Sequence, residues 1–200
     1  MAHPETDRNA AAAQPGGQVL PGEILLRDGT PALIWPLLST DARMLREGFR
    51  RLSSESRQHR FLGVLGELND SMIRRLVGSA DGVHHIALVL IVLPPEGEER
   101  PVGVAHLLQN PGDPSAADVA VAVADDWQGR GVGTALVSAL RERRPGAVKR
   151  LRTNVSSGNR ASLALLAGAG RVSSHPDSRG VLEVTVELRP RPSASAAAAC

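Results

Sequence analysis

The chain contains no tyrosine, and its 200 residues include only two phenylalanines and two tryptophans. Hydrophobic residues nevertheless make up 42% of the chain, which is enough for a well-formed core. That core must therefore be built from leucine, valine, alanine and isoleucine side chains. The absence of tyrosine also excludes a phenol as the proton donor in any reaction that the chain performs.

Cysteine is almost absent as well. The single cysteine, Cys200, is the last residue, so it cannot form a disulfide within the chain, and no metal-ligand spacing surrounds it. The pair His84-His85 has no partners at metal-binding intervals either. The sequence therefore predicts no metal site.

Long hydrophobic runs and a strong excess of one charge are also missing. No apolar stretch reaches the roughly 20 residues that a membrane span requires, and the N-terminus lacks the pattern of a signal peptide. The formal net charge is +2, and the arginines are scattered over expected helix faces without forming a basic stripe. We expect a cytoplasmic protein that has neither a membrane nor a nucleic acid as its partner.

The two ends of the chain differ in composition from the middle. Residues 1–21 and 190–200 are rich in alanine, glycine, proline and other small or polar residues, which cannot bury enough apolar surface to order the chain. Both segments are expected to be disordered tails. One folded domain is expected over residues 22–189.

Hydrophobic periodicity and turn signals predict a mixture of strands and helices within this domain. Residues 83–93 are apolar almost throughout, as in a central strand that is buried on both faces. The prolines and glycine within residues 110–114 predict a loop. The expected strands span residues 24–27, 32–36, 83–93, 102–109, 117–124, 148–154, 171–174 and 181–188, and the expected helices span residues 40–52, 56–62, 70–77, 130–143 and 159–167.

The most informative segment runs from Val119 to Leu140, where a short strand pattern leads into a glycine-rich turn and then an apolar-periodic helix. The turn, Gln128-Gly-Arg-Gly-Val-Gly133, has glycine at every second position, and glycine adopts backbone conformations closed to other residues. A strand that feeds such a turn directs free N–H groups and the positive end of the helix dipole toward one point, which predicts a phosphate site. No lysine follows Gly133, which argues against a P-loop, and the G-x-G-x-x-G spacing of dinucleotide-binding folds is not met.

This segment resembles the acyl-CoA signature of the GNAT superfamily of N-acyltransferases, Gln/Arg-x-x-Gly-x-Gly/Ala, with Gln128, Gly131 and Gly133 at its defined positions. A second block, 159–170, is similar to the family's next helix, although Leu166 stands where many members carry tyrosine and Arg171 where phenylalanine is usual. Three N-terminal segments are similar to the acyltransferase domain of bacterial Pat-type protein lysine acetyltransferases: Leu26-Arg-Asp-Gly-Thr-Pro, Leu52-Ser-Ser-Glu-Ser-Arg and Arg60-Phe-Leu-Gly.

The resemblance implies a GNAT-like fold of the α/β (α+β) class. Its central sheet is mixed and mostly antiparallel, and helices flank it. The strands near residues 119 and 148 are expected to splay apart, because the family's fold leaves a gap there for the pantetheine arm of acetyl-CoA. Acetyl-CoA is thus the expected acyl donor.

The resemblance also implies which residues bind the donor. The main chain of Val121 and Val123 would pair with the pantetheine arm like an added strand, and Asn159 would bond this arm from the neighbouring helix. The pyrophosphate would be held at the turn by Gln128, Gly129, Arg130, Gly131, Gly133 and Thr134.

Acetyl transfer to an amine also needs a group that takes the amine's proton. The resemblance places Asp118 where Pat-like members usually carry a glutamate, and its shorter side chain would act directly or through a water molecule. The alternative interpretation is a solvent-facing aspartate at the start of a strand. His106 on the adjacent strand is a second candidate base, whereas Asp125 and Asp126 lie in the turn, where acidic residues commonly shape the backbone.

Three functions are compatible with these patterns. The first is the transfer of an acetyl group to a primary amine, with a protein lysine as the preferred acceptor. The second is acetylation of a small-molecule amine, and the third is a catalytically silent module that binds acyl-CoA. The sequence leaves the acceptor, the acyl-chain length and the oligomeric state open.

Overall fold

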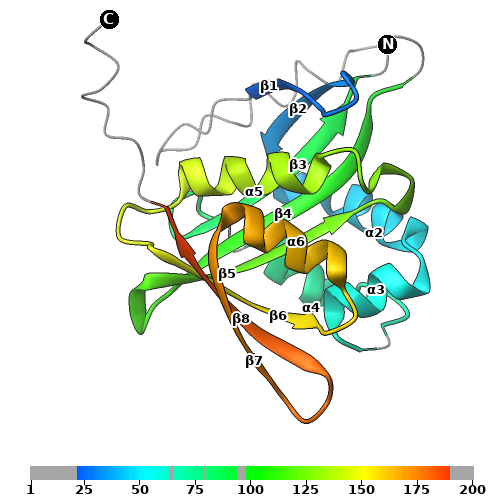
Figure 1. Cartoon of the computed structure of the whole chain (residues 1–200). Coiled ribbons are helices and arrows are strands. Elements are labelled where there is room, and N and C mark those ends of the chain that lie inside the picture. The colour runs from blue at the N-terminus through cyan, green and yellow to red at the C-terminus, as the bar shows by residue number, and fades with distance from the viewer. Residues whose placement is uncertain (1–21, 64, 79, 94–97, 190–200) are drawn as a thin grey trace, which may run out of the picture.

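The computed structural model describes residues 22–63, 65–78, 80–93 and 98–189, so the predicted tails lie outside the described residues. Eight strands within these ranges form one sheet in the order β1-β2-β3-β4-β5-β6-β8-β7 (Figure 1). Only β5 and β6 pair in parallel, so the predicted mixed, mostly antiparallel sheet is confirmed. The strands are β1 (Gly22–Leu25), β2 (Pro31–Pro36), β3 (His85–Val92), β4 (Arg100–Asn110), β5 (Asp113–Val123), β6 (Arg150–Ser156), β7 (Gly170–Pro176) and β8 (Val181–Leu188).

Helices cover both faces of the sheet (Figure 1). α5 and α6 lie on one face, and α2, α3 and α4 lie on the other. No helix in the described ranges is long and apolar enough to cross a bilayer. The helices are α2 (Ala42–Arg51), α3 (Ser54–Phe61), α4 (Asp70–Ile73), α5 (Val132–Arg143) and α6 (Arg160–Ala169), and shorter helical turns span Ser39–Asp41, Arg74–Gly78 and Asp125–Trp127.

The central strand β3 connects the two hydrophobic layers. Every residue of β3 is buried, as its continuous apolar run predicts. Leu88 and Leu90 belong to the cluster beneath α5, while Val89 belongs to the cluster beneath α2. Because full burial of such a side chain stabilises the fold by roughly 1.5–3 kcal/mol, β3 anchors both layers at once.

The sheet opens into a fork between β5 and β6. These strands pair only between Ala116–Asp118 and Arg150–Arg152. Beyond Asp118, β5 pairs with β4 alone and β6 pairs with β8 alone. The predicted splay is therefore confirmed, and its vertex lies at Asp118.

Most predicted boundaries shift by one to four residues, and two of these shifts have clear local reasons. The expected loop 110–114 shrinks to Pro111-Gly112, because a tight proline-glycine turn lets β4 extend to Asn110 and β5 begin at Asp113. The strand expected from residue 148 starts at Arg150, because Val148 still belongs to a turn in which its N–H donates to the Pro145 carbonyl at 3.0 Å.

Candidate functional site

Two adjoining clefts occupy the fork. The first, which we call the turn groove, has a volume of about 410 Å³ and follows β5 from Val121 to the glycine-rich turn. The second, the Asp118 cleft, has a volume of about 340 Å³ and contains Asp118 at the vertex. Both clefts are lined by His59, Arg60, Val121 and Asn159, so they form one continuous space.

The glycine-rich turn presents main-chain donors to the turn groove. α5 begins at Val132, two residues later than predicted, because Gly131 has a φ of 96° and cannot be part of the helix. The first bond of the helix runs from the Ala135 N–H to the Gly131 carbonyl at 2.9 Å. In the described part of the chain, the N–H groups of residues 129–134 meet no protein acceptor. Free N–H groups at the positive end of a helix are suited to a phosphate.

The groove residues predicted on β5 and α6 are brought together as expected. Val121, Val123 and Asn159 all line the turn groove, and the edge of β5 that faces it has no strand partner beyond Asp118. An extended ligand can therefore pair with this edge. The Asn159 side-chain oxygen caps α6 by accepting from the Ser162 N–H at 3.0 Å, which leaves the amide NH₂ group for a ligand.

Gln128 and Asp125 hold the turn against α3. Asp125 accepts from the Ser53 main-chain N–H at 2.8 Å and from the Ser56 hydroxyl at 2.7 Å, and Gln128 donates to the Ser56 oxygen at 3.1 Å. Burial raises the pKa of Asp125, but these hydrogen bonds outweigh it and lower that pKa overall. The two side chains thus fasten the walls of the groove, which explains the serines of the Leu52-Ser-Ser-Glu-Ser-Arg motif.

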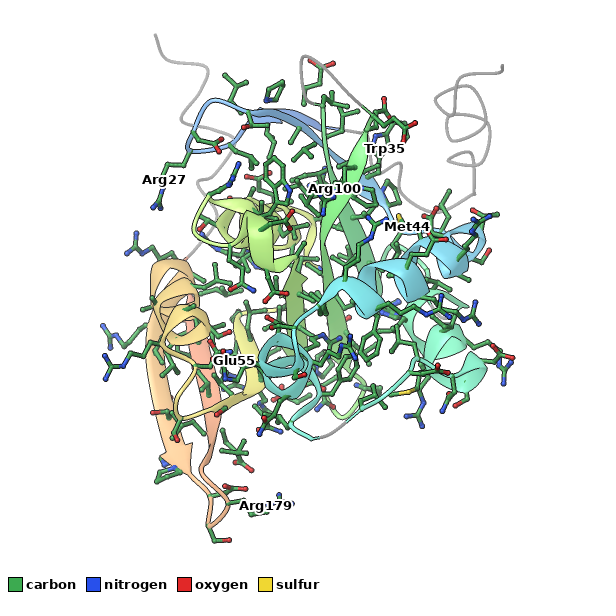
Figure 2. The ribbon with its side chains drawn as sticks, turned by 90° about the vertical axis from the view of Figure 1, so that its right-hand side faces the viewer. Arg27, Trp35, Met44, Glu55, Arg100 and Arg179 are labelled. Carbon is green, nitrogen blue, oxygen red and sulfur yellow. The ribbon has the colours of Figure 1, made fainter. Side chains whose placement is uncertain are left out.

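Arg27, and not the side chain of Arg130, lines the turn groove. The Arg130 side chain does not line the groove, because its guanidinium lies 4.6 Å from the Trp127 ring centroid and 3.6 Å from an Asp28 carboxylate oxygen. Arg27 lines it instead, since the Arg27 N–H donates to the Arg130 carbonyl at 3.2 Å and fixes the turn after β1 beside the glycines. Figure 2 shows the Arg27 side chain pointing outward from this hairpin. The motif Leu26-Arg-Asp-Gly-Thr-Pro was the available signal for this residue.

Asp118 lies among cationic side chains. It is the last residue of β5 that pairs with β6, opposite Arg152, and its side chain is exposed in the cleft. The Arg152 guanidinium is bonded to Asp113 at 2.9 Å. α3 adds His59 and Arg60 to the cleft, and neither was among the predicted site residues. A carboxylate, an imidazole and two guanidinium groups therefore meet at the vertex of the fork.

Arg60 has no counter-ion in the described ranges. No hydrogen bond or ion pair with another described residue holds its guanidinium, which lies 4.9 Å from the Phe61 ring centroid, and burial lowers the pKa of this group. Removing a cation from water without a partner is costly, so such a group is suited to a bound anion or to developing negative charge. Its position in both clefts makes Arg60 a candidate functional residue.

His106, the second candidate base, is unsuited to that task. The ring is buried, and its Nδ1 lies 3.4 Å from the Nε2 of His85. Burial, with smaller effects of Arg60 and His85, lowers the pKa of His106 to about 3. The imidazole is therefore neutral near pH 7 and a weak proton acceptor. In the described residues no group of three or more histidine, cysteine, aspartate or glutamate side chains could hold a metal ion.

The buried His106 should make the fold acid-sensitive. Between pH 6.5 and 3 the unfolded chain binds a proton that the folded chain excludes, so stability falls as the pH decreases through this window. We expect the wild type to lose about 2 kcal/mol more unfolding free energy than His106→Leu between pH 7 and pH 5. Urea unfolding at both pH values measures this difference. The exposed His175→Leu is the control, and equal losses in wild type and His106→Leu would contradict the assignment.

Two comparisons with known proteins point to the same family. The model of the acetyltransferase (GNAT) family matches residues 45–170. A Pseudomonas aeruginosa protein named as an acetyltransferase is 33% identical over 115 residues, which cover 58% of this chain and 60% of that protein. The chain thus matches less than two thirds of the length of this curated relative.

Solved structures show the same fold. The GNAT domain of S. lividans PAT superposes with a TM-score of 0.70 at 23% identity, covering 84% of this chain and 97% of that one. A cAMP-binding acyltransferase from Mycobacterium smegmatis superposes with a TM-score of 0.56 at 22% identity, covering 92% of this chain and 50% of that one. At these identities the likeness concerns the fold alone.

Proposed function

Because the chain belongs to the acetyltransferase (GNAT) family, we propose that it transfers an acyl group from acyl-CoA, acetyl-CoA in the simplest case, to a primary amine. The observation that carries the proposal is the fork between β5 and β6. This fork joins a turn of free N–H groups to an exposed carboxylate through one continuous space. A donor with phosphates at one end and a reactive thioester at the other fits such a space.

The donor would lie along the unpaired edge of β5. Its pyrophosphate would accept hydrogen bonds from the N–H groups of residues 129–134, with Arg27 supplying a further positive charge. Its pantetheine arm would pair with the main chain of Val121 and Val123, and the Asn159 amide would donate to it from α6. The thioester would then lie near the level of Arg60, close to the Asp118 cleft.

In the reaction, the amine nitrogen attacks the thioester carbon, a C–N bond forms and the C–S bond breaks. Asp118 would take the amine's proton, directly or through water. The Arg60 guanidinium would stabilise negative charge on the carbonyl oxygen or on the departing sulfur. Leu166 lines the Asp118 cleft where many family members place a tyrosine, so the thiolate would take its proton from water.

The acceptor would enter the Asp118 cleft. The Asp118 carboxylate attracts an ammonium, and the cationic Arg60 offsets the effect of this carboxylate on the ammonium's pKa, which helps the unprotonated, nucleophilic amine to form. Two exposed apolar side chains flank Asp118, because Leu62 lines the cleft and Leu108 pairs with Asp118 across the sheet. Such a rim suits the methylene stem of a lysine, so we propose a protein lysine as the acceptor.

Release of free CoA thiol from acetyl-CoA tests this function. We expect release with a lysine-rich protein and little release with the same protein after dimethylation of its lysines. Lys149 is the only lysine of the chain, so self-acetylation adds little background. Faster release with polyamines or amino sugars would make a small amine the acceptor. Binding of acetyl-CoA without release in any arm would identify a silent acyl-CoA-binding module.

A further inference from the structure

A third cavity branches from the turn groove on the face of the sheet that α2 and α3 cover. Its volume is about 90 Å³, and its wall is apolar except at Arg60 and His106. Met44, Phe49 and Val104 are among its lining residues. We call this space the side cavity.

The side cavity exists because the residues that follow Asp118 on this face of β5 are alanines. Ala120 and Ala122 alternate with the valines that face α5 and α6, and Ala124 follows the strand directly. Ala122 lies opposite Val104 of β4. Protein interiors are otherwise packed without voids of this size. The small side chains of β5 thus leave room under α2.

The cavity connects to the turn groove rather than to the acceptor end of the site. Leu52, Arg60 and Ala122 line both the side cavity and the turn groove, whereas Arg60 alone is shared with the Asp118 cleft. α3 explains this arrangement. Its first turn is bonded to Asp125 and Gln128, and Arg60 lies seven residues beyond Ser53, about 10 Å further along the helix axis. Leu52 and Ala122 lie nearer the turn, whereas Arg60 marks the end of the cavity that is beside the thioester of the proposed donor.

We propose that the side cavity binds the hydrocarbon part of the acyl group, so that the preferred donors are short-chain acyl-CoAs of about four or five carbons. A cavity of about 150 Å³ lined by apolar side chains binds benzene, so about 90 Å³ suits roughly three or four carbon atoms beyond the thioester. This inference rests on the proposed function, because it places the acyl donor in the turn groove.

Calorimetric binding of an acyl-CoA series tests the inference without knowledge of the acceptor. Each buried methylene contributes about 0.8 kcal/mol, so butyryl-CoA should bind about tenfold more tightly than acetyl-CoA. The gain should end near five carbons, because the chain of octanoyl-CoA exceeds the cavity. An affinity that is equal for acetyl-CoA and butyryl-CoA, or that rises steadily through eight carbons, would overturn the proposal. Failure to bind acetyl-CoA at all would instead overturn the proposed function.

A matched pair of variants tests the location. Gly48 of α2 lines the side cavity alone, and a Cβ added there meets no atom within 4 Å, so Gly48→Leu should fold and fill the space. Gly168 of α6 is equally open but lies outside all three clefts, which makes Gly168→Leu the control. We expect Gly48→Leu to lose the preference for butyryl-CoA and to keep acetyl-CoA binding within twofold, while Gly168→Leu keeps both. A preference that persists in Gly48→Leu would place the acyl chain elsewhere.

Discussion

Replacing Gly131 with valine is expected to abolish acyl-CoA binding while the chain remains folded. Gly131 has a φ of 96°, a conformation that β-branched residues avoid, and a Cβ there would lie 3.4 Å from both the Cβ and the main-chain nitrogen of Arg27. Relief of this strain must rotate or displace the turn that presents the N–H groups of residues 129–134. In wild type, acetyl-CoA at 100 times its dissociation constant should stabilise the fold by about 2.7 kcal/mol, and we expect no such stabilisation in Gly131→Val.

A second glycine provides the control for backbone strain. Gly180 has a φ of 76° in the β7–β8 hairpin and lines neither the turn groove nor the Asp118 cleft. Gly180→Val should lower the melting temperature of the free protein to a similar extent as Gly131→Val but keep the shift caused by acetyl-CoA. A full ligand-induced shift in Gly131→Val would contradict the assignment of the turn to the phosphates.

The glycine-rich turn beside the turn groove could be predicted from the sequence because its signals are local. The strand, the turn and the start of α5 are consecutive in the chain, so glycine spacing and hydrophobic period report on them directly. The fork itself followed only from the family resemblance, and the pairing of Ala116–Asp118 with Arg150–Arg152 confirms it. The shifted start of α5 has a local cause, the positive φ of Gly131, which composition does not reveal.

The rest of the site depends on contacts between distant segments. His59 and Arg60 reach the Asp118 cleft because Ser53 and Ser56 bond to Asp125, some 70 residues later in the chain. No periodicity within α3 indicates that contact. The same holds for Arg130, whose stacking on Trp127 and pairing with Asp28 remove its side chain from the groove. The charged residues around the two clefts can be read from the sequence, but the positions of their side chains depend on tertiary packing.

Asp118→Asn is expected to lower kcat/KM for amine acetylation on the order of 100-fold or more, because asparagine cannot accept the proton of the attacking amine. The donor affinity should change little, since Asp118 lines the Asp118 cleft and is not among the residues of the turn groove. Steady-state kinetics with a lysine-rich acceptor and calorimetry with acetyl-CoA measure the two quantities separately. The exposed Asp126→Asn, whose carboxylate pairs with Arg100 at 3.0 Å outside both clefts, is the control for loss of one negative charge.

The pH dependence of the reaction rate of Asp118→Asn shows whether Asp118 is the base or has only a structural role. If Asp118 is the base, raising the pH should partly restore the rate of Asp118→Asn, because a larger fraction of the acceptor amine is then already unprotonated. His59 is the next candidate, since its imidazole lines both clefts whereas His106 is buried and neutral. Wild-type activity in Asp118→Asn together with a 100-fold loss in His59→Gln would transfer the role to the imidazole. A loss in Asp118→Asn that does not depend on pH would instead mean that the carboxylate holds the vertex of the fork in shape and takes no proton.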